Sequence, residues 1–246
     1  MTAMPDPRSG PGKDAALVQA MFDRVAPRYD TANTLLSLGQ DRHWRRVAVL
    51  AAGVRPGDTA VDVACGTGPL SAELARAGAQ VVAVDFSWSM LSTGARRLGH
   101  RVRWVNGDAM ALPLPDACAD AVTIGFGLRN LPDPAAGLAE MARVTKPGGR
   151  LVVLEFSHPT WAPFRAVYER YLLGGVPLLA NALTSHPAAY RYLAESVQAW
   201  PDQRTLASTI AAAGWERVRW KNLTGGIVAC HQAIRLTAGC VGTSPR

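Results

Sequence analysis

Cysteine is scarce in this chain, and no two cysteines lie close together. The 246 residues contain four of them, Cys65, Cys118, Cys230 and Cys240. Their separation excludes a zinc site built from Cys-x-x-Cys pairs and a small secreted scaffold held by disulfides. No cluster of histidine, cysteine and carboxylate residues has metal-ligand spacing, so we expect no metal site. We expect a reduced, cytoplasmic protein.

Long hydrophobic runs are also missing. The most apolar stretch, residues 171–183, contains Gly174, Gly175 and Pro177. It is shorter than the roughly 20 apolar residues that a transmembrane helix needs. Residues 1–13 contain no apolar segment of the kind found in signal peptides, and we expect them to form a disordered tail.

Acidic residues are fewer than basic ones. Asp and Glu number 19 against 26 Lys and Arg, and 26 − 19 gives a formal net charge of +7. This excess fits an anionic membrane surface, a nucleic acid or simple solubility. The cluster Arg42-His-Trp-Arg-Arg46 combines cations with an aromatic ring, which suits peripheral membrane contact. An exposed helix face with one buried tryptophan explains the cluster equally well.

Short apolar segments alternate with helical segments along most of the chain. The pattern predicts strands near 59–64, 80–84, 102–105, 119–124, 150–155, 216–221 and 226–234. It predicts helices near 14–30, 41–52, 69–77, 88–97, 134–144 and 203–213. Strands separated by helices of this length form parallel βαβ units. We therefore expect an α/β fold with a doubly wound, mostly parallel, Rossmann-like sheet, as a single domain over 14–235 followed by a tail at 236–246.

Residues 156–200 interrupt this alternation, because they are helical in pattern and rich in Tyr and Trp. In a doubly wound fold, an insertion after the fifth strand lies near the ends of the strands where ligands bind. We expect this helical insertion to form a lid or part of the substrate pocket.

A glycine turn after the first strand indicates a cofactor site. Gly66 and Gly68 permit a tight turn and close approach of a ligand to the backbone, beside amides at a helix N-terminus. Ser71 replaces the third glycine of the dinucleotide fingerprint, which disfavours a pyrophosphate of the NAD type. Asp62 is placed to meet a cationic amine, and Asp85 to accept hydrogen bonds from ribose hydroxyls. An amine, a ribose and no pyrophosphate describe S-adenosylmethionine.

The third strand is followed by Asn106-Gly-Asp108-Ala109. A carboxylate at Asp108 can accept a hydrogen bond from an adenine amine, with Met110 and Leu112 offering apolar contact. Each feature has a simpler alternative: the glycines can be only a tight turn, Asp85 a solvated strand end and Asp108 a turn residue. Together they predict a cofactor site.

Beyond these residues, several longer motifs of the sequence resemble those of a known family, the ubiquinone/menaquinone biosynthesis C-methyltransferases. The resemblance covers roughly residues 18–232. It is carried by motifs in Met21–Asp30, Leu36–Gly39 with Trp44-Arg45, Ile124–Asn130, Arg143–Ser157, Tyr190–Val197, Trp200–Gln203 and Asn222–Ala229. The Lys-Pro-Gly-Gly segment at 146–149 is common to many methyltransferases, whereas Gly127-Leu-Arg-Asn130 and Tyr190-Arg-Tyr-Leu-Ala-Glu-Ser196 are far more specific.

The resemblance implies transfer of a methyl group from S-adenosylmethionine to a ring carbon of a prenylated quinol. The expected acceptor is demethylmenaquinol, with a benzoquinol ubiquinone precursor or a secondary-metabolite aromatic as alternatives. Thr67, Asp85, Asp108 and Ala109 match cofactor-binding positions of the family. The chain departs from the family at Gly125, where serine is usual, and at Gln232–Arg235, where an aromatic–lysine ending is usual.

Three residues are expected to carry the chemistry. A ring carbon becomes nucleophilic when a phenolic hydroxyl ionises, so the site needs a group that stabilises the phenolate. Arg129 can do so because a guanidinium stays charged. Asn130 can orient the hydroxyl or a water molecule, and Tyr29 can close the pocket. The resemblance implies the same three positions.

Other assignments remain open from the sequence. Arg129 can be a structural ion pair, Asn130 a loop anchor and Tyr29 a core aromatic. His158, His186 and Glu155 are alternative bases. A nucleic-acid methyltransferase is disfavoured because Gly125–Asn130 lacks the Asn-Pro-Pro-aromatic pattern of a loop that holds a flipped base, so we expect no nucleic-acid partner.

Overall fold

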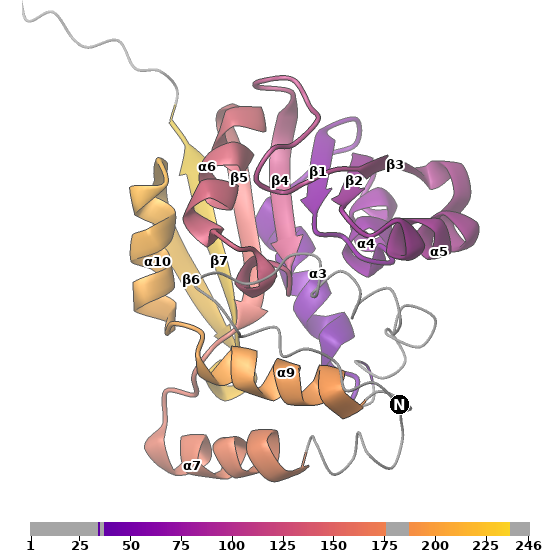
Figure 1. Ribbon diagram of the computed structural model, residues 1–246. Helices are drawn as coiled ribbons and strands as arrows, with labels where there is room; N and C mark the ends of the chain where they lie inside the picture. Colours follow the sequence, from indigo (N-terminus) through magenta and orange to yellow (C-terminus); the bar gives the residue numbers. More distant parts are fainter. Residues whose placement is uncertain (1–33, 35–36, 176–186, 237–246) are drawn as a thin grey trace, which may run out of the picture.

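The computed structural model describes residue 34 and residues 37–175 and 187–236 of the chain. At its centre is a seven-stranded sheet with the order β3-β2-β1-β4-β5-β7-β6 (Figure 1). The strands are β1 (Thr59–Val63), β2 (Gln80–Asp85), β3 (Val102–Asn106), β4 (Ala119–Gly125), β5 (Thr145–Phe156), β6 (Trp215–Leu223) and β7 (Val228–Arg235).

The first five strands of the sheet are parallel, and β7 lies antiparallel between β5 and β6. The chain adds β2 and β3 on one side of β1 and then continues with β4 on the other side. This reversal is the point at which open α/β sheets bind ligands, outside the carboxyl ends of the strands. The predicted doubly wound, mostly parallel sheet is confirmed.

Helices cover both faces of the sheet. One hydrophobic cluster joins the sheet to α3 (Gln40–Ala52), α4 (Pro69–Arg76) and α5 (Trp88–Leu98). A second cluster joins the opposite face to α6 (Pro134–Val144) and α10 (Gln203–Ala212). The strands alternate between the two clusters, as Ala60 and Val61 do on β1, because successive side chains of a strand point to opposite faces.

The start of β5 differs from its prediction. The sequence pattern predicts a strand from Arg150, but pairing with β4 begins at Thr145, opposite Ala119, and continues from Arg150, opposite Ala121. The four residues between them form an irregularity in the ladder, with Gly148 at φ 80°. A glycine tolerates this left-handed conformation, so the strand absorbs the Lys-Pro-Gly-Gly segment instead of starting after it.

The segment between β5 and α10 is helical, as predicted, in its described parts. It contains α7 (Ala162–Arg170), the π-helical turn η4 (Tyr171–Gly175) and α9 (Pro187–Gln198). A small third hydrophobic cluster centred on Tyr168, Ala194 and Val197 packs these helices against Phe156 and Ile227. Figure 1 shows α7 and α9 at the end of the sheet where β1 and β4 terminate.

Several expectations fall outside the described residues. These are the helix at 14–30, the tail at 1–13, most of the tail at 236–246, Tyr29 and His186. Among the described residues, no helix is both long enough and apolar enough to cross a membrane.

Candidate active site

A large cavity of about 1330 Å³ lies at the carboxyl ends of the parallel strands. One part is lined by the loops after β1, β2 and β3, and includes Gly66, Asp85 and Asp108. The other part is lined by aromatic residues and by the short helix η3 (Leu128–Asn130), which follows β4. The cavity therefore joins the predicted cofactor residues, with the exception of Asp62, to Arg129 and Asn130 in one space.

The glycine loop has the conformation that the sequence predicts. Gly66 and Gly68 have φ values of 57° and 79°, in the left-handed region that favours glycine. A Cβ added at Gly66 would meet no atom within 4 Å, whereas one at Gly68 would lie 2.5 Å from the Trp104 ring. The backbone at Gly66 is thus open for a ligand to approach, and Thr67 lies between the two glycines in the same lining.

Asp85 ends β2 beside this loop. One carboxylate oxygen accepts a hydrogen bond from the Gly66 amide and the other from the Ser87 amide, both at 2.8 Å. These two backbone donors fix the orientation of the Asp85 carboxylate in the cavity wall.

Asp62 lies beneath the loop and is not among the residues that line the cavity. It is buried, and its carboxylate accepts hydrogen bonds from the hydroxyls of Ser71 at 2.5 Å and Thr123 at 2.8 Å. Burial raises the pKa of Asp62 to about 6, and these two hydrogen bonds oppose the rise. The structure thus holds Asp62 as a support between β1, α4 and β4. Its predicted contact with an amine stays a prediction.

Asp108 and Ala109 lie on the loop after β3, and both line the cavity. Asp108 is exposed, and its carboxylate accepts a hydrogen bond from the Met110 amide at 2.9 Å. Ala109 is buried.

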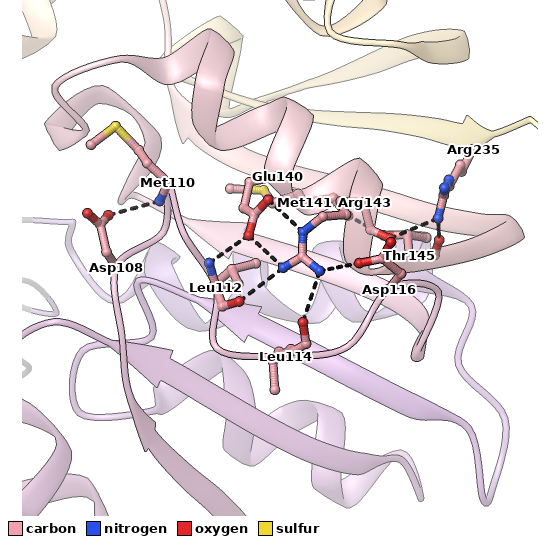
Figure 2. Close-up of polar contacts among 10 residues, drawn as sticks. All are labelled: Asp108, Met110, Leu112, Leu114, Asp116, Glu140, Met141, Arg143, Thr145 and Arg235. Carbon is pink, nitrogen blue, oxygen red and sulfur yellow. Dashed lines mark hydrogen bonds and ion pairs between the residues drawn. The ribbon is translucent and has the colours of Figure 1, made fainter.

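This loop is fastened to α6 by one arginine, as Figure 2 shows. The Arg143 guanidinium donates to the carbonyl oxygens of Leu112 and Leu114 and to the carboxylates of Glu140 and Asp116. Glu140 in turn accepts a hydrogen bond from the Leu112 amide at 2.7 Å. Because the arginine bonds loop carbonyls as well as carboxylates, it fixes the backbone that carries Asp108.

Arg129 forms a buried ion pair with Glu155. Its Nη1 lies 2.7 Å from Oε1 of Glu155 and donates also to the Phe126 carbonyl oxygen at 2.7 Å. The Arg129 side chain is 4% exposed and that of Glu155 is 0% exposed. Glu155 also accepts hydrogen bonds from the backbone amides of Arg129 and Phe156. Arg129 lines the cavity and Glu155 does not, so Glu155 acts as the anchor of the guanidinium.

Two tyrosines of the helical insertion face these residues. The Tyr192 hydroxyl, on α9, donates to Oδ1 of Asn130 at 3.4 Å, and Tyr168 on α7 is buried nearby. Burial raises the pKa of both hydroxyls, and the positive charge of Arg129 acts in the opposite direction. Both tyrosines therefore remain protonated at neutral pH and can donate hydrogen bonds.

Strained backbone occurs at two strand ends in the cavity wall. Ala64 after β1 has φ 50° and Phe126 after β4 has φ 58°, values that are uncommon for residues other than glycine. At Phe126 the ring lies 4.9 Å from that of Phe156 and 6.0 Å from that of Trp44. The Arg129 guanidinium lies 5.0 Å from the centroid of the Phe156 ring. Such strain often marks functional sites, and here it accompanies an aromatic wall beside Arg129.

Two alternatives from the sequence are decided by these contacts. Nε2 of His158 lies 2.7 Å from the Trp200 carbonyl oxygen, and His158 is not among the cavity-lining residues, so it is held as a structural residue. Trp44 is 4% exposed, and its indole N–H donates to the Thr224 hydroxyl. The interpretation of Trp44 as a membrane-facing residue is therefore wrong, because its ring is used in the core.

Sequence reasoning missed part of the site. Tyr168, Tyr192 and the anchoring role of Glu155 depend on how the helical insertion and β5 approach the loop after β4. The motif around Tyr192 is specific to the family that the sequence resembles, but its residues do not indicate that the Tyr192 side chain contacts Asn130.

Comparison with known proteins places these features in context. The sequence model of the ubiE/COQ5 methyltransferase family matches residues 11–235. A protein of Mycobacterium sp. (strain KMS), named demethylmenaquinone methyltransferase, is 58% identical over 218 residues, which cover 89% of this chain and 94% of the relative. A protein of the same name from Renibacterium salmoninarum is 56% identical over 89% of this chain and 92% of the relative.

Solved structures share the fold at low sequence identity. The [4+2]-cyclase SpnF has a TM-score of 0.68 at 19% identity, covering 97% of this chain and 100% of SpnF. A SAM-dependent methyltransferase from Aquifex aeolicus has a TM-score of 0.57 at 18% identity, covering 78% of this chain and 89% of that chain. Because one of these structures is a cyclase, the fold alone does not determine the reaction.

Proposed function

The chain belongs to the ubiE/COQ5 methyltransferase family, and from this membership we propose that it methylates a ring carbon of a prenylated quinol, with demethylmenaquinol as the acceptor. The name shared by relatives at 55–58% identity supports the choice of acceptor. The observation that carries the proposal is the single cavity that joins the glycine loop and Asp85 to Arg129 and the aromatic wall.

The loops after β1, β2 and β3 are the proposed cofactor site. S-adenosylmethionine, when bound, supplies an electrophilic methyl group. The open backbone at Gly66 and the fixed Asp85 carboxylate fit a ribose, and Asp108 with Ala109 and Met110 fits an adenine edge and face. Thr67 and Gly68 follow Gly66 in the glycine loop after β1 and line the same part of the proposed cofactor site. Asp62 supports the loop from below through Ser71.

Arg129 is the proposed stabiliser of the phenolate. Its guanidinium is a delocalised cation with several donors in a planar fork, and the bond to Glu155 fixes its position at the cavity wall. A preorganised cation lowers the free energy of the oxyanion more than of the neutral hydroxyl, which raises electron density on the ring carbon. A guanidinium is too basic to remove the phenolic proton itself, so water takes that proton. When the ring carbon gains the methyl group, the hydrogen on that carbon also leaves as a proton to water, which restores the aromatic ring.

Asn130, Tyr192 and Tyr168 are proposed to position the quinol oxygens. The Tyr192–Asn130 hydrogen bond holds an amide and a hydroxyl beside Arg129, where they can bond a hydroxyl of the ring. Phe126 and Phe156 provide the apolar surface for the ring. Tyr29 remains a proposed member of this group from the family resemblance.

An acceptor panel tests the proposal. The wild-type protein is incubated with labelled S-adenosylmethionine and with short-chain demethylmenaquinol, its oxidised quinone or a benzoquinol. We expect methyl transfer to the naphthoquinol and none to the oxidised quinone, because only the quinol can ionise to a phenolate. Transfer to the benzoquinol alone would reassign the acceptor, and equal transfer to the oxidised quinone would contradict the phenolate mechanism.

A further inference from the structure

Large apolar side chains are exposed where the cavity opens. Seven such residues are exposed on the described part of the chain, and Leu38, Trp161 and Val167 belong to this end. Leu38 is 83% exposed and Val167 is 65% exposed, yet both line the cavity, so they mark its mouth. Trp161, 68% exposed, immediately precedes α7, which carries Val167.

The helix α7 has two different faces at this mouth. Phe164 and Tyr168 of α7, with Tyr171 at the start of the adjoining turn η4, follow helical spacing and line the cavity. Residues 163, 166, 167 and 170 follow the same spacing on another side and are all exposed. The outer side of α7 therefore presents the apolar Pro163, Ala166 and Val167 beside the cationic Arg170, with Val167 at the rim of the cavity, and no described element packs over this side.

Leu38 reaches the mouth from the turn before α3. Its φ of 53° is in the left-handed region, which is uncommon for a leucine, and the next residue, Gly39, has φ 77°. The turn thus accepts a strained conformation that leaves a leucine side chain in solvent. Leu38 belongs to none of the hydrophobic clusters formed by the described residues, which points to a contact outside the protein.

Cations surround these apolar residues. Arg42 and Arg46 on α3 line the cavity and are exposed, and Arg165 and Arg170 on α7 are exposed. Among nearby acidic groups, the Asp41 carboxylate is buried and paired with Arg45, which leaves Glu169 as the exposed acid of α7. The charge of this surface is therefore positive and complementary to an anionic partner.

We propose that this surface, formed by α7, the turn at Leu38 and the start of α3, docks on an anionic lipid bilayer. Exposed Trp, Val and Leu can enter the headgroup region while the arginines contact lipid phosphates. A prenylated quinol would then pass from the bilayer into the cavity through the mouth without its tail crossing water; this last step rests on the proposed function. A nucleic acid could also bind the arginines through its phosphates, but it would leave the exposed Trp, Val and Leu side chains without a contact.

Sedimentation of the full chain with vesicles tests the docking without any substrate. Vesicles of phosphatidylcholine alone are compared with vesicles containing phosphatidylglycerol, at low and high salt. The test variants are Trp161→Ser and Ala166→Asp, both exposed and neither lining the cavity. The matched controls are Leu50→Ser and Leu50→Asp, because Leu50 is 81% exposed near the other end of α3.

We expect binding to the anionic vesicles that weakens at high salt. Trp161→Ser should reduce the partition coefficient about tenfold, from lost burial of the ring. Ala166→Asp should reduce it about fivefold, the effect of one charge near the surface. The Leu50 variants should bind like wild type. No binding to anionic vesicles at low salt, equal binding by all variants, or retention only by duplex RNA would overturn the proposal.

A kinetic arm separates this proposal from the proposed function. Trp161→Ser should methylate a water-soluble short-chain quinol at the wild-type rate and a vesicle-embedded quinol more slowly. Methyl transfer to neither acceptor by the wild type, with vesicle binding intact, would reject the proposed function and leave the docking surface standing. Equal rates of the variant and the wild type on the vesicle-embedded acceptor would overturn the docking route.

Discussion

At the scale of single residues, the central feature is a charge that is buried together with its counterion. Removing water from Arg129 and Glu155 costs free energy that their ion pair only partly offsets, so such pairs add little net stability. The pair is better explained by position, because Glu155 holds the guanidinium at the wall of the cavity where a phenolate would form.

Changing Arg129 alone is expected to disturb folding as well as chemistry. Arg129→Gln leaves the Glu155 carboxylate buried without its cation, which typically costs about 3–5 kcal/mol of unfolding free energy. The double variant Arg129→Gln/Glu155→Gln should recover most of this stability. In that variant we expect cofactor affinity within about twofold of wild type and turnover at least ~100-fold lower, the usual cost of losing an oxyanion donor.

Calorimetric titration with S-adenosylmethionine and single-turnover methyl transfer measure the two effects separately. Arg204→Gln, an exposed position on α10, is the control. Turnover near the wild-type rate in the double variant would remove Arg129 from the mechanism.

Asp62 gives a prediction about pH. Its pKa of about 6 in the folded protein lies above the value of 3.8 expected in the unfolded chain, so the folded state binds more protons between these values. Stability should therefore fall as the pH rises from about 4 to about 6, by up to ~3 kcal/mol for this group. Asp62→Asn keeps both hydrogen-bonding partners and should flatten this part of the profile.

Urea unfolding of the two proteins across this pH range measures the difference. The gain of Asp62→Asn relative to wild type should be larger at pH 7 than at pH 4. A difference that is constant with pH would show that Asp62 does not titrate with a raised pKa.

The sequence indicated which residues at the strand ends would gather at one place, and their role in cofactor binding stays a prediction. Gly66, Asp85 and Asp108 line one cavity because parallel strands bring their carboxyl ends to one edge of the sheet. Asp62 differs, because the residue lies within β1 and its side chain turns toward α4. Tyr192 could not be predicted, since its contact with Asn130 depends on where α9 crosses the loop after β4.

At the scale of elements, the loop after β3 depends on a side chain from α6. Arg143 donates hydrogen bonds to the backbone carbonyl oxygens of Leu112 and Leu114 (Figure 2). Because every residue has such an oxygen, these bonds hold the loop backbone whatever side chains the loop carries. The sequence motif that contains Arg143 was visible, but its partners lie about thirty residues earlier in the chain.

Releasing this loop should weaken cofactor binding. Arg143→Met removes the donors to Leu112, Leu114 and Glu140, so Asp108 and Ala109 lose their fixed position. We expect the dissociation constant of S-adenosylmethionine to rise about tenfold, because one to two net hydrogen bonds are worth roughly that factor. The matched control is Lys146→Met, which breaks the partly exposed ion pair with Asp120 and should leave the affinity unchanged.

Titration of both variants, followed by tryptophan fluorescence, measures the affinities. Equal affinities for Arg143→Met and Lys146→Met would show that the loop is held without the arginine.

Most elements were predicted from the alternation of apolar segments, whereas the order of the last strands was not. β7 enters between β5 and β6, antiparallel to both. A short turn from Leu223 to Val228 allows an antiparallel hairpin, but apolar periodicity does not state which strand the hairpin pairs with.

At the scale of the whole molecule, the fold divides into a sheet with two covered faces and a separate helical cluster at its edge. The cluster around Tyr168, Ala194 and Val197 meets the rest through Phe156 and Ile227. The two large clusters that hold the sheet do not include α7. The sheet therefore positions the residues of the proposed cofactor site, and the helical insertion lines the part of the cavity proposed to bind the methyl acceptor.

Removing residues 160–190 tests this division. Replacement of the segment by a flexible glycine–serine linker should leave binding of S-adenosylmethionine within about threefold and abolish methyl transfer, since Phe164 and Tyr168 are lost from the cavity. Circular dichroism and calorimetric titration check folding and binding. Loss of the whole fold would show that the insertion is part of the main core.

The most direct test of the account is the position of the transferred methyl group. Wild-type protein is given S-adenosylmethionine with a deuterated methyl and reduced short-chain demethylmenaquinone, and the product is analysed by mass spectrometry and then oxidised. We predict a labelled product that oxidises to a quinone, because a carbon-methylated ring keeps both hydroxyls. A labelled product that resists oxidation would place the methyl on oxygen and contradict activation of the ring carbon beside Arg129.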